Sequence, residues 1–198
     1  MKLPVTGSQT VGPFYHYALD RPDWADLTRH GAKGEKIRIE GTILDGDGVP
    51  CPDAFLEIWQ ANAAGRYAHP EDRQEERKLD PRFLGFGRVS PDAKGRYGFT
   101  TIRPGAVPGR GNALQAPHIA VNVFARGILK HLVTRIYFPD FAAANDADPV
   151  LGAIDDAAHR ATLIAKRGKP KKVGGVSIPV YRFDVILQGA GETAFFDI

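Results

Sequence analysis

Apolar and polar residues alternate in several short runs along the chain. In the first run, Ile37, Ile39 and Ile43 are separated by polar residues and a glycine, and the run ends at Asp-Gly-Asp-Gly in positions 45–48. Side chains of a β-strand point alternately to the two faces of a sheet, so this period of two predicts a strand with one buried face. The Asp-Gly pairs that follow are typical of a hairpin turn.

Further strand-like runs are separated by clusters rich in glycine and proline. They cover residues 54–61, 83–90, 97–103, 118–126, 131–138 and 180–188. Several short strands with regular turn signals favour an antiparallel β-sandwich. We therefore expect a mostly β fold, with a single antiparallel β-sandwich domain over residues 1–198.

A short helical region near residues 140–165 interrupts the strands. Residues 141–147 are rich in alanine, and acidic residues stand at the start of the run 155–165, where the first turn of a helix favours them. We expect this region to cover an edge of a sheet. Residues 20–36 have few apolar positions in any period, which indicates an exposed connection.

Composition is ordinary for a globular protein, with 43% hydrophobic and 25% charged residues. A chain of 198 residues can bury most of the surface that its unfolded form exposes. Cys51 is the only cysteine, which excludes an intrachain disulfide and a thiolate metal cluster. The residues before Gly12 contain no apolar run, and no stretch is long enough to span a bilayer, so we expect a cytoplasmic protein without a membrane partner.

The formal net charge of +3 is mild, and the basic run at 166–172 supplies much of it. Such a run can mark contact with nucleic acid. This one has no interleaved aromatic residues and contains Gly168 and Pro170, which are typical of turns. We interpret it as a solvated hairpin loop and expect no nucleic-acid partner.

Two stretches, at positions 56–69 and 115–120, bear most on function. The first begins Leu-Glu-Ile-Trp-Gln-Ala and contains Tyr67, and the second contains Ala-Pro-His-Ile-Ala with His118. In these stretches the chain resembles the intradiol catechol dioxygenases. The resemblance continues over nearly the whole chain, in fragments at 8–15, 56–61, 116–119, 124–127, 134–138, 162–167 and 189–198.

The resemblance implies a metal site that has lost half of its ligands. Iron-bearing members of the family hold a non-haem Fe(III) with two tyrosines and two histidines, the histidines as His-Ile-His on one strand. Here Tyr67 and His118 stand at matching positions, but Val107 and Ala120 replace the second tyrosine and the second histidine. Gln115 stands where the active chains carry an arginine.

Simple coordination chemistry leads to the same conclusion. Alternate residues of a strand share a face, so replacing the second histidine of a His-x-His pair with alanine leaves one nitrogen donor. A hard trivalent ion needs several fixed donors and supporting neighbours, so we expect this chain to bind no metal. A hydrogen-bonded core position is the expected role of His118, and Tyr67 is expected to pack its ring and keep its hydroxyl in water.

Some members of the family are built from two homologous chains, of which only one carries iron, and this chain resembles the iron-free one. The resemblance implies a homologous iron-bearing partner in a higher hetero-oligomer. The pair would cleave 3,4-dihydroxybenzoate with O2 to 3-carboxy-cis,cis-muconate, in the breakdown of aromatic acids. Residues 1–35 would form an N-terminal arm that contributes to the subunit interface.

Arg126 is the leading candidate for substrate recognition. It ends a predicted strand and precedes Gly127, which permits a sharp change of direction, and its guanidinium can fork onto a carboxylate. An exposed arginine of this kind ordinarily forms a surface salt bridge. The resemblance implies instead that Arg126 lies at the subunit interface, near the carboxylate of the bound substrate.

A segment near the N-terminus completes the set of candidate substrate-binding residues. The resemblance implies that Thr10, Gly12, Pro13 and Tyr15 form a loop that closes the mouth of the partner's active site. Glycine and proline at this point would fix a backbone that can approach a flat ring closely.

Two alternatives remain open. The first is a homo-oligomeric intradiol dioxygenase with altered iron ligands, which would purify with iron and the colour of tyrosinate-to-iron charge transfer. The second is a metal-free β-sandwich that binds a small ligand without chemistry, which would be a stable monomer.

Overall fold

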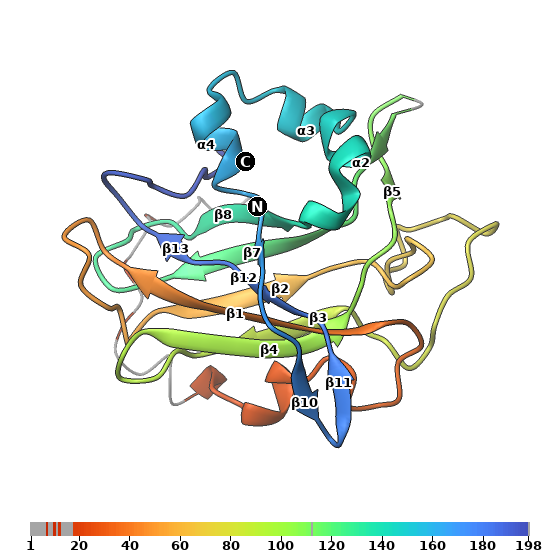
Figure 1. The fold of residues 1–198 in the computed structure, drawn as a ribbon, viewed down its shortest axis with the longest axis horizontal. Coiled ribbons are helices and arrows are strands. Elements are labelled where there is room, and N and C mark those ends of the chain that lie inside the picture. The colour runs from red at the N-terminus through yellow and green to blue at the C-terminus, as the bar shows by residue number, and fades with distance from the viewer. Residues whose placement is uncertain (1–6, 8–9, 11, 13–17, 112, 198) are drawn as a thin grey trace, which may run out of the picture.

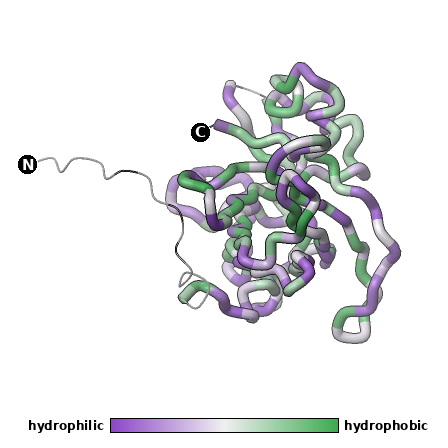
Figure 2. The backbone as a smooth tube through the Cα atoms, turned by 90° about the vertical axis from the view of Figure 1, so that its left-hand side faces the viewer, coloured by the Kyte–Doolittle hydropathy of each residue, from purple (hydrophilic) through white to green (hydrophobic). Residues whose placement is uncertain are grey.

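The computed structural model describes residues 7, 10, 12, 18–111 and 113–197. Within them, two β-sheets enclose a shared hydrophobic core, and short helices lie outside one of the sheets (Figure 1). The mostly β sandwich expected from the sequence is confirmed. Hydrophobic segments are concentrated in the body of the molecule, whereas much of its periphery is hydrophilic (Figure 2).

The first sheet is built around a long strand near the N-terminal end of the described chain. Its path is β13-β1-β12-β9, with β4 paired to β1 off this path. The strands are β1 (Lys36–Leu44), β4 (Arg96–Ile102), β9 (Lys166–Arg167), β12 (Val180–Arg182) and β13 (Val185–Ile186). The pairs β1·β4 and β12·β9 are antiparallel, but β12 and β13 both run parallel to β1. This sheet is therefore mixed, whereas the sequence predicted antiparallel pairing throughout.

The second sheet is antiparallel throughout and has the order β3-β2-β7-β8. Its strands are β2 (Phe55–Trp59), β3 (Phe86–Val89), β7 (His118–Phe124) and β8 (Leu132–Tyr137). Two short hairpins lie outside the main sheets: β5 (Val107–Pro108) pairs with β6 (Leu114–Gln115), and β10 (Lys171–Val173) pairs with β11 (Val176–Ile178).

The core follows directly from the alternation seen in the sequence. Every second residue of β1, including Ile37, Ile39 and Ile43, is completely buried, and so is Phe99 of β4. From the other sheet, residues 119, 121 and 123 of β7 point into the same cluster. Full burial of one such side chain contributes about 1.5–3 kcal/mol, so this shared core holds the two sheets together.

A close contact between two backbones explains why Gly41 interrupts the apolar face of β1. A Cβ at this position would lie 1.8 Å from the carbonyl oxygen of Phe183, at the break between β12 and β13. The same oxygen accepts a hydrogen bond of 2.5 Å from the Tyr97 hydroxyl. The glycine thus permits a close approach of two backbones where the parallel strands change.

The helical region lies outside the second sheet. It comprises η2 (Pro139–Phe141), α2 (Ala142–Asp146), α3 (Pro149–Gly152) and α4 (Ala157–Ala161). It covers β8 through a small apolar cluster that includes Tyr137, Leu151 and Leu163. The second predicted helix ends at Ala161, earlier than expected, because the backbone beyond it pairs with β8: Leu163 O accepts from Tyr137 N at 2.9 Å.

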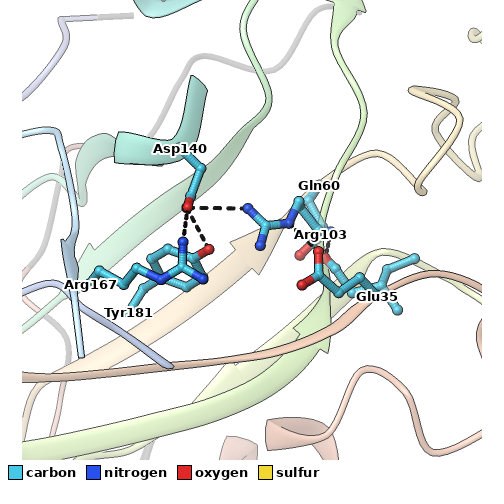
Figure 3. Close-up of polar contacts among 7 residues, drawn as sticks. Glu35, Gln60, Arg103, Asp140, Arg167 and Tyr181 are labelled. Carbon is cyan, nitrogen blue, oxygen red and sulfur yellow. Dashed lines mark hydrogen bonds and ion pairs between the residues drawn. The ribbon is translucent and has the colours of Figure 1, made fainter. Parts of the chain in front are cut away.

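Asp140 connects the helical region to the first sheet (Figure 3). Its carboxylate accepts a hydrogen bond from the Tyr181 hydroxyl at 2.5 Å, lies 3.3 Å from Nη1 of Arg103, and pairs with Arg167. Arg103 also pairs with Glu35 at 2.6 Å. Burial alone would raise the pKa of Asp140, but the hydrogen bonds from Tyr181 and Arg103 hold it below its ordinary value.

Two segments differ from their predicted structure. Residues 20–36 are not simply an exposed connection: they contain η1 (Pro22–Ala25), Leu27 is 3% exposed in the core, and its N–H donates to Thr100 O at 2.9 Å. An irregular segment buries single side chains without a period, so alternation did not reveal it. The basic run at 166–172 includes strand residues as well as a loop, and Lys171 pairs with Glu40 at 2.6 Å.

No helix in the described ranges combines the length and the apolar character needed to cross a lipid bilayer.

Candidate functional site

Tyr67 lies in the loop after β2 and is half-buried. Its ring stacks on Trp59, with 5.6 Å between ring centroids and 14° between the planes. Its backbone N–H donates to Asp72 Oδ2 at 2.7 Å, which fixes the loop. Burial raises the pKa of the Tyr67 hydroxyl. The phenol is therefore protonated at neutral pH.

His118 begins β7 and is 4% exposed. Its Nδ1 lies 2.7 Å from Ala116 O, and because a carbonyl oxygen only accepts, Nδ1 carries the proton. Burial lowers the pKa of His118 to about 4, so the ring is neutral at pH 7. The expectation of a hydrogen-bonded core histidine is confirmed.

Val107 and Ala120 occupy the positions of the second tyrosine and the second histidine, and neither side chain has an atom that can donate to a metal. Val107 is 4% exposed in β5, directly opposite Gln115 in β6. Ala120 lies in β7 between Trp59 of β2 and Arg135 of β8. Neither methyl-bearing side chain can bind a metal, and a guanidinium beside Ala120 would repel one.

The four positions that correspond to metal ligands in the family do not line one common cavity. Tyr67 and Val107 line a groove of about 760 Å³, and Ala120 lines a separate cavity of about 590 Å³ together with Gln115. His118 lines neither of them. Among the described residues, no group of three or more His, Cys, Asp or Glu side chains could hold a metal ion. The residues present do not fit a ferric ion, and the absence of iron from this chain stays a prediction.

Arg135 is a functional candidate that the sequence did not reveal. It points from β8 toward the cavity beside Ala120, and its Nη1 donates to Gln115 Oε1 at 2.6 Å and to the Tyr137 hydroxyl at 3.3 Å. Arginine is common on exposed strand faces, so its type gave no signal. Only the register of β7 and β8, which sets Arg135 opposite Ala120, shows its place.

Asp148 is a second residue that sequence reasoning missed. It is 1% exposed, and its Oδ2 accepts from Ala116 N at 2.7 Å while its Oδ1 caps α3 through Val150 N and Leu151 N. The carboxylate thus joins the helical region to the strand that carries His118. An aspartate before a proline is a recognisable helix cap, and this signal could have been found in the sequence.

Arg126 lies beyond the other end of β7. Its side chain is 78% exposed and forms an ion pair with Asp53. The neighbouring Gly127 has a φ of 82°, which allows the chain to turn, and its N–H donates to Thr10 Oγ1 at 3.0 Å. The structure therefore places Thr10 beside Gly127, the residue that follows Arg126. Gly12 is exposed, and Pro13 and Tyr15 lie outside the described residues.

The two groups of candidate residues are far apart. A strand rises about 3.3 Å per residue, so the six residues from Ala120 to Arg126 place them roughly 20 Å apart. Arg126 cannot contact a ligand in the cavity beside Ala120. Any substrate that Arg126 binds must lie elsewhere on the chain's surface or in a partner.

The two-sheet sandwich, with Tyr67 in the loop after β2 and His118 at the start of β7, can now be compared with known protein families. A family model described as Dioxygenase matches residues 11–189. The chain therefore belongs to the intradiol ring-cleavage dioxygenase family.

Particular relatives narrow the comparison. The chain is 42% identical over 207 residues to the protocatechuate 3,4-dioxygenase alpha chain of Pseudomonas putida, covering 98% of this chain and 97% of that relative. It is 39% identical over 198 residues to the protocatechuate 3,4-dioxygenase beta chain of Burkholderia cepacia, covering 96% and 78%. The structure of hydroxyquinol 1,2-dioxygenase from Pseudomonas putida shares the fold, with a TM-score of 0.61 at 20% identity over 93% of this chain and 68% of that one.

Proposed function

We propose that this chain is the non-catalytic alpha subunit of a protocatechuate 3,4-dioxygenase. It assembles with a homologous beta chain that carries Fe(III), in a hetero-oligomer of αβ units. The assembly cleaves 3,4-dihydroxybenzoate with O2 to 3-carboxy-cis,cis-muconate. The lone Cys51 suits a reducing compartment, and we place the assembly in the cytoplasm.

One observation carries this proposal. The chain is similar over 98% of its length to an alpha chain, and it lacks two metal donors that the family uses. Val107 and Ala120 stand in their places, and the cationic Arg135 lies opposite Ala120. Ring cleavage in the assembly therefore falls to the partner, where the iron supplies the activation of substrate and O2. This chain contributes the walls that orient the substrate, which lowers the entropic part of the barrier.

The position of Arg126 supports a role across the interface. It lies roughly 20 Å from this chain's own cavity, at an exposed end of β7. A guanidinium carries five N–H donors, so Arg126 can remain paired with Asp53 through Nε and still bind a second carboxylate. We propose that this second carboxylate belongs to 3,4-dihydroxybenzoate in the beta chain's pocket. Thr10 would hold the adjoining loop, and Gly12, Pro13 and Tyr15 would close the mouth of the pocket.

The proposal predicts that the chain depends on its partner. A permanent subunit interface buries apolar and aromatic surface, which would face water in the isolated chain. In this proposal residues 1–198 form one domain, and residues 1–35 contribute an arm to that interface.

Reconstitution tests the proposal. The chain is expressed alone and together with the homologous beta chain from the same source, and ring cleavage is followed by the loss of 3,4-dihydroxybenzoate. We expect activity and a stable complex only when both chains are present. A well-behaved monomer that ignores the beta chain would favour a ligand-binding module, and activity of the chain alone would favour a homo-oligomeric dioxygenase.

A further inference from the structure

A cavity of about 590 Å³ lies between the second sheet and the helical region. Its walls come from β7 and β8, from α3 and the residues after it, and from the C-terminal segment; they include Ala120, Val133, Ile154 and Phe196. This size falls within the range of small-molecule sites, which are mostly apolar with a few polar groups that orient the ligand.

Arg135 is the half-buried charged group of the lining, to which the exposed Arg110 also belongs, and within the described residues its contacts are with neutral groups. Its Nη1 donates to Gln115 Oε1 and the Tyr137 hydroxyl, and its Cζ lies 5.9 Å from the centroid of the Phe196 ring. None of the ion pairs in the described part of the chain includes Arg135. The charge of this half-buried guanidinium is therefore not balanced by a direct acidic partner.

The nearby carboxylate of Asp148 is already engaged. It accepts hydrogen bonds from the backbone N–H groups of residues 116, 150 and 151 at 2.7–2.9 Å. It lies 3.4 Å from the Tyr137 hydroxyl, so it reaches Arg135 only through that hydroxyl. This arrangement fixes Tyr137 and leaves the guanidinium without a direct acidic partner.

The remaining donors of Arg135 define what the cavity can bind. Both of its hydrogen bonds leave from Nη1, so Nε and Nη2 still offer N–H groups in the fork geometry that matches a carboxylate. Of the two guanidinium groups in the lining, Arg110 is exposed and Arg135 is half-buried, so the apolar part of the cavity can pair one carboxylate, with Arg135. The apolar walls suit a ligand with a hydrocarbon or aromatic body.

We propose that this cavity is a binding site for a small monocarboxylate, whose carboxylate pairs with Arg135 and whose apolar body packs against Ile154 and Phe196. The site lies within this chain and is distinct from the surface around Arg126. It does not depend on the presence of a beta chain.

Fluorine NMR tests the site in the assembly in which the chain purifies. The probe is 4-fluorobenzoate, and 4-fluorobenzamide serves as the neutral control of the same shape. We expect a saturable bound signal for the acid, and binding of the amide weaker by roughly ten- to a hundredfold, the range for loss of a charge-assisted pair. A probe bound close to a partner's iron would be broadened by the paramagnetic centre, which separates the two locations.

Variants locate the signal. Arg135→Gln should weaken the binding of 4-fluorobenzoate roughly ten- to a hundredfold. Arg96→Gln removes an exposed guanidinium on the opposite sheet and should leave binding unchanged. Ala120→Leu narrows the cavity beside Arg135 without changing its charge and should weaken the binding of 4-fluorobenzoate even if Arg135→Gln fails to fold. Undiminished binding in Arg135→Gln or Ala120→Leu, or equal binding of the amide, would overturn the proposal.

Discussion

Replacing Arg126 with alanine separates substrate recognition from stability. The side chain is 78% exposed, and its partner Asp53 is 31% exposed. An ion pair of this exposure contributes about 0–1 kcal/mol to folding, so the variant should fold with little loss of stability. Its effect on the assembled enzyme can then be attributed to the substrate or to the interface.

The expected effect on substrate follows from the charge pair. A carboxylate held by a guanidinium at a partly desolvated interface is worth about 1.5–3 kcal/mol. At about 1.4 kcal/mol per factor of ten, the loss corresponds to a roughly ten- to hundredfold rise in KM for 3,4-dihydroxybenzoate. Catechol lacks the carboxylate, so its turnover should hardly change.

Steady-state kinetics of the reconstituted αβ enzyme, with both substrates, measure this difference. Asp53→Asn is the matched control, because it removes the ion pair within this chain and leaves Arg126 in place. We expect this control to retain a near-normal KM. Equal losses for both substrates in Arg126→Ala would mean that the arginine holds the interface together, and no loss for either would refute its role in recognition.

Three further predictions concern the rest of the chain. The pKa of His118 is about 4 in the folded chain and 6.5 in the unfolded chain, so the free energy of unfolding should fall by about 3 kcal/mol as pH falls from 6.5 to 4. In chemical unfolding at several pH values, His118→Gln should show a flatter pH dependence over this range. An unchanged dependence would contradict this role of His118. Gly41→Ala should lower the free energy of unfolding by about 3 kcal/mol, because the added Cβ would lie 1.8 Å from the Phe183 carbonyl oxygen. Thermal unfolding measures this loss, and an unchanged stability would refute the close contact. The triple change Val107→Tyr, Ala120→His, Gln115→Arg supplies the missing groups but not their supporting neighbours, so elemental analysis should find iron well below one per chain; stoichiometric iron would show that the surroundings are still suitable.

The sequence predicted the strands because each has one face in the core. Alternation located β1, β2, β4, β7 and β8 to within a few residues, since their inward side chains meet the same apolar interior. Pairing direction was not predictable in this way. The strands β12 and β13 reach β1 from far along the chain, so no short turn fixes their direction relative to it.

The candidate site was predictable only in part. Missing donors at Val107 and Ala120 can be read from residue types, since neither side chain has a ligand atom. The roles of Arg135 and Asp148 depend instead on strand register and on contacts between distant segments, such as Ala116 N with Asp148 Oδ2. The pairing of Arg126 with Asp53 likewise joins residues that no local pattern connects.

The iron content of each chain decides whether the metal belongs to the beta chain alone. The αβ complex, purified after joint expression, is analysed by native mass spectrometry and elemental analysis, and again with a metal-ligating tyrosine and a metal-ligating histidine of the beta chain changed to phenylalanine and alanine. We expect one iron per αβ pair, bound to the beta chain, and loss of both iron and ring cleavage in the variant. Two irons per pair, or iron and activity that persist in the variant, would show that this chain binds metal and would refute its non-catalytic role.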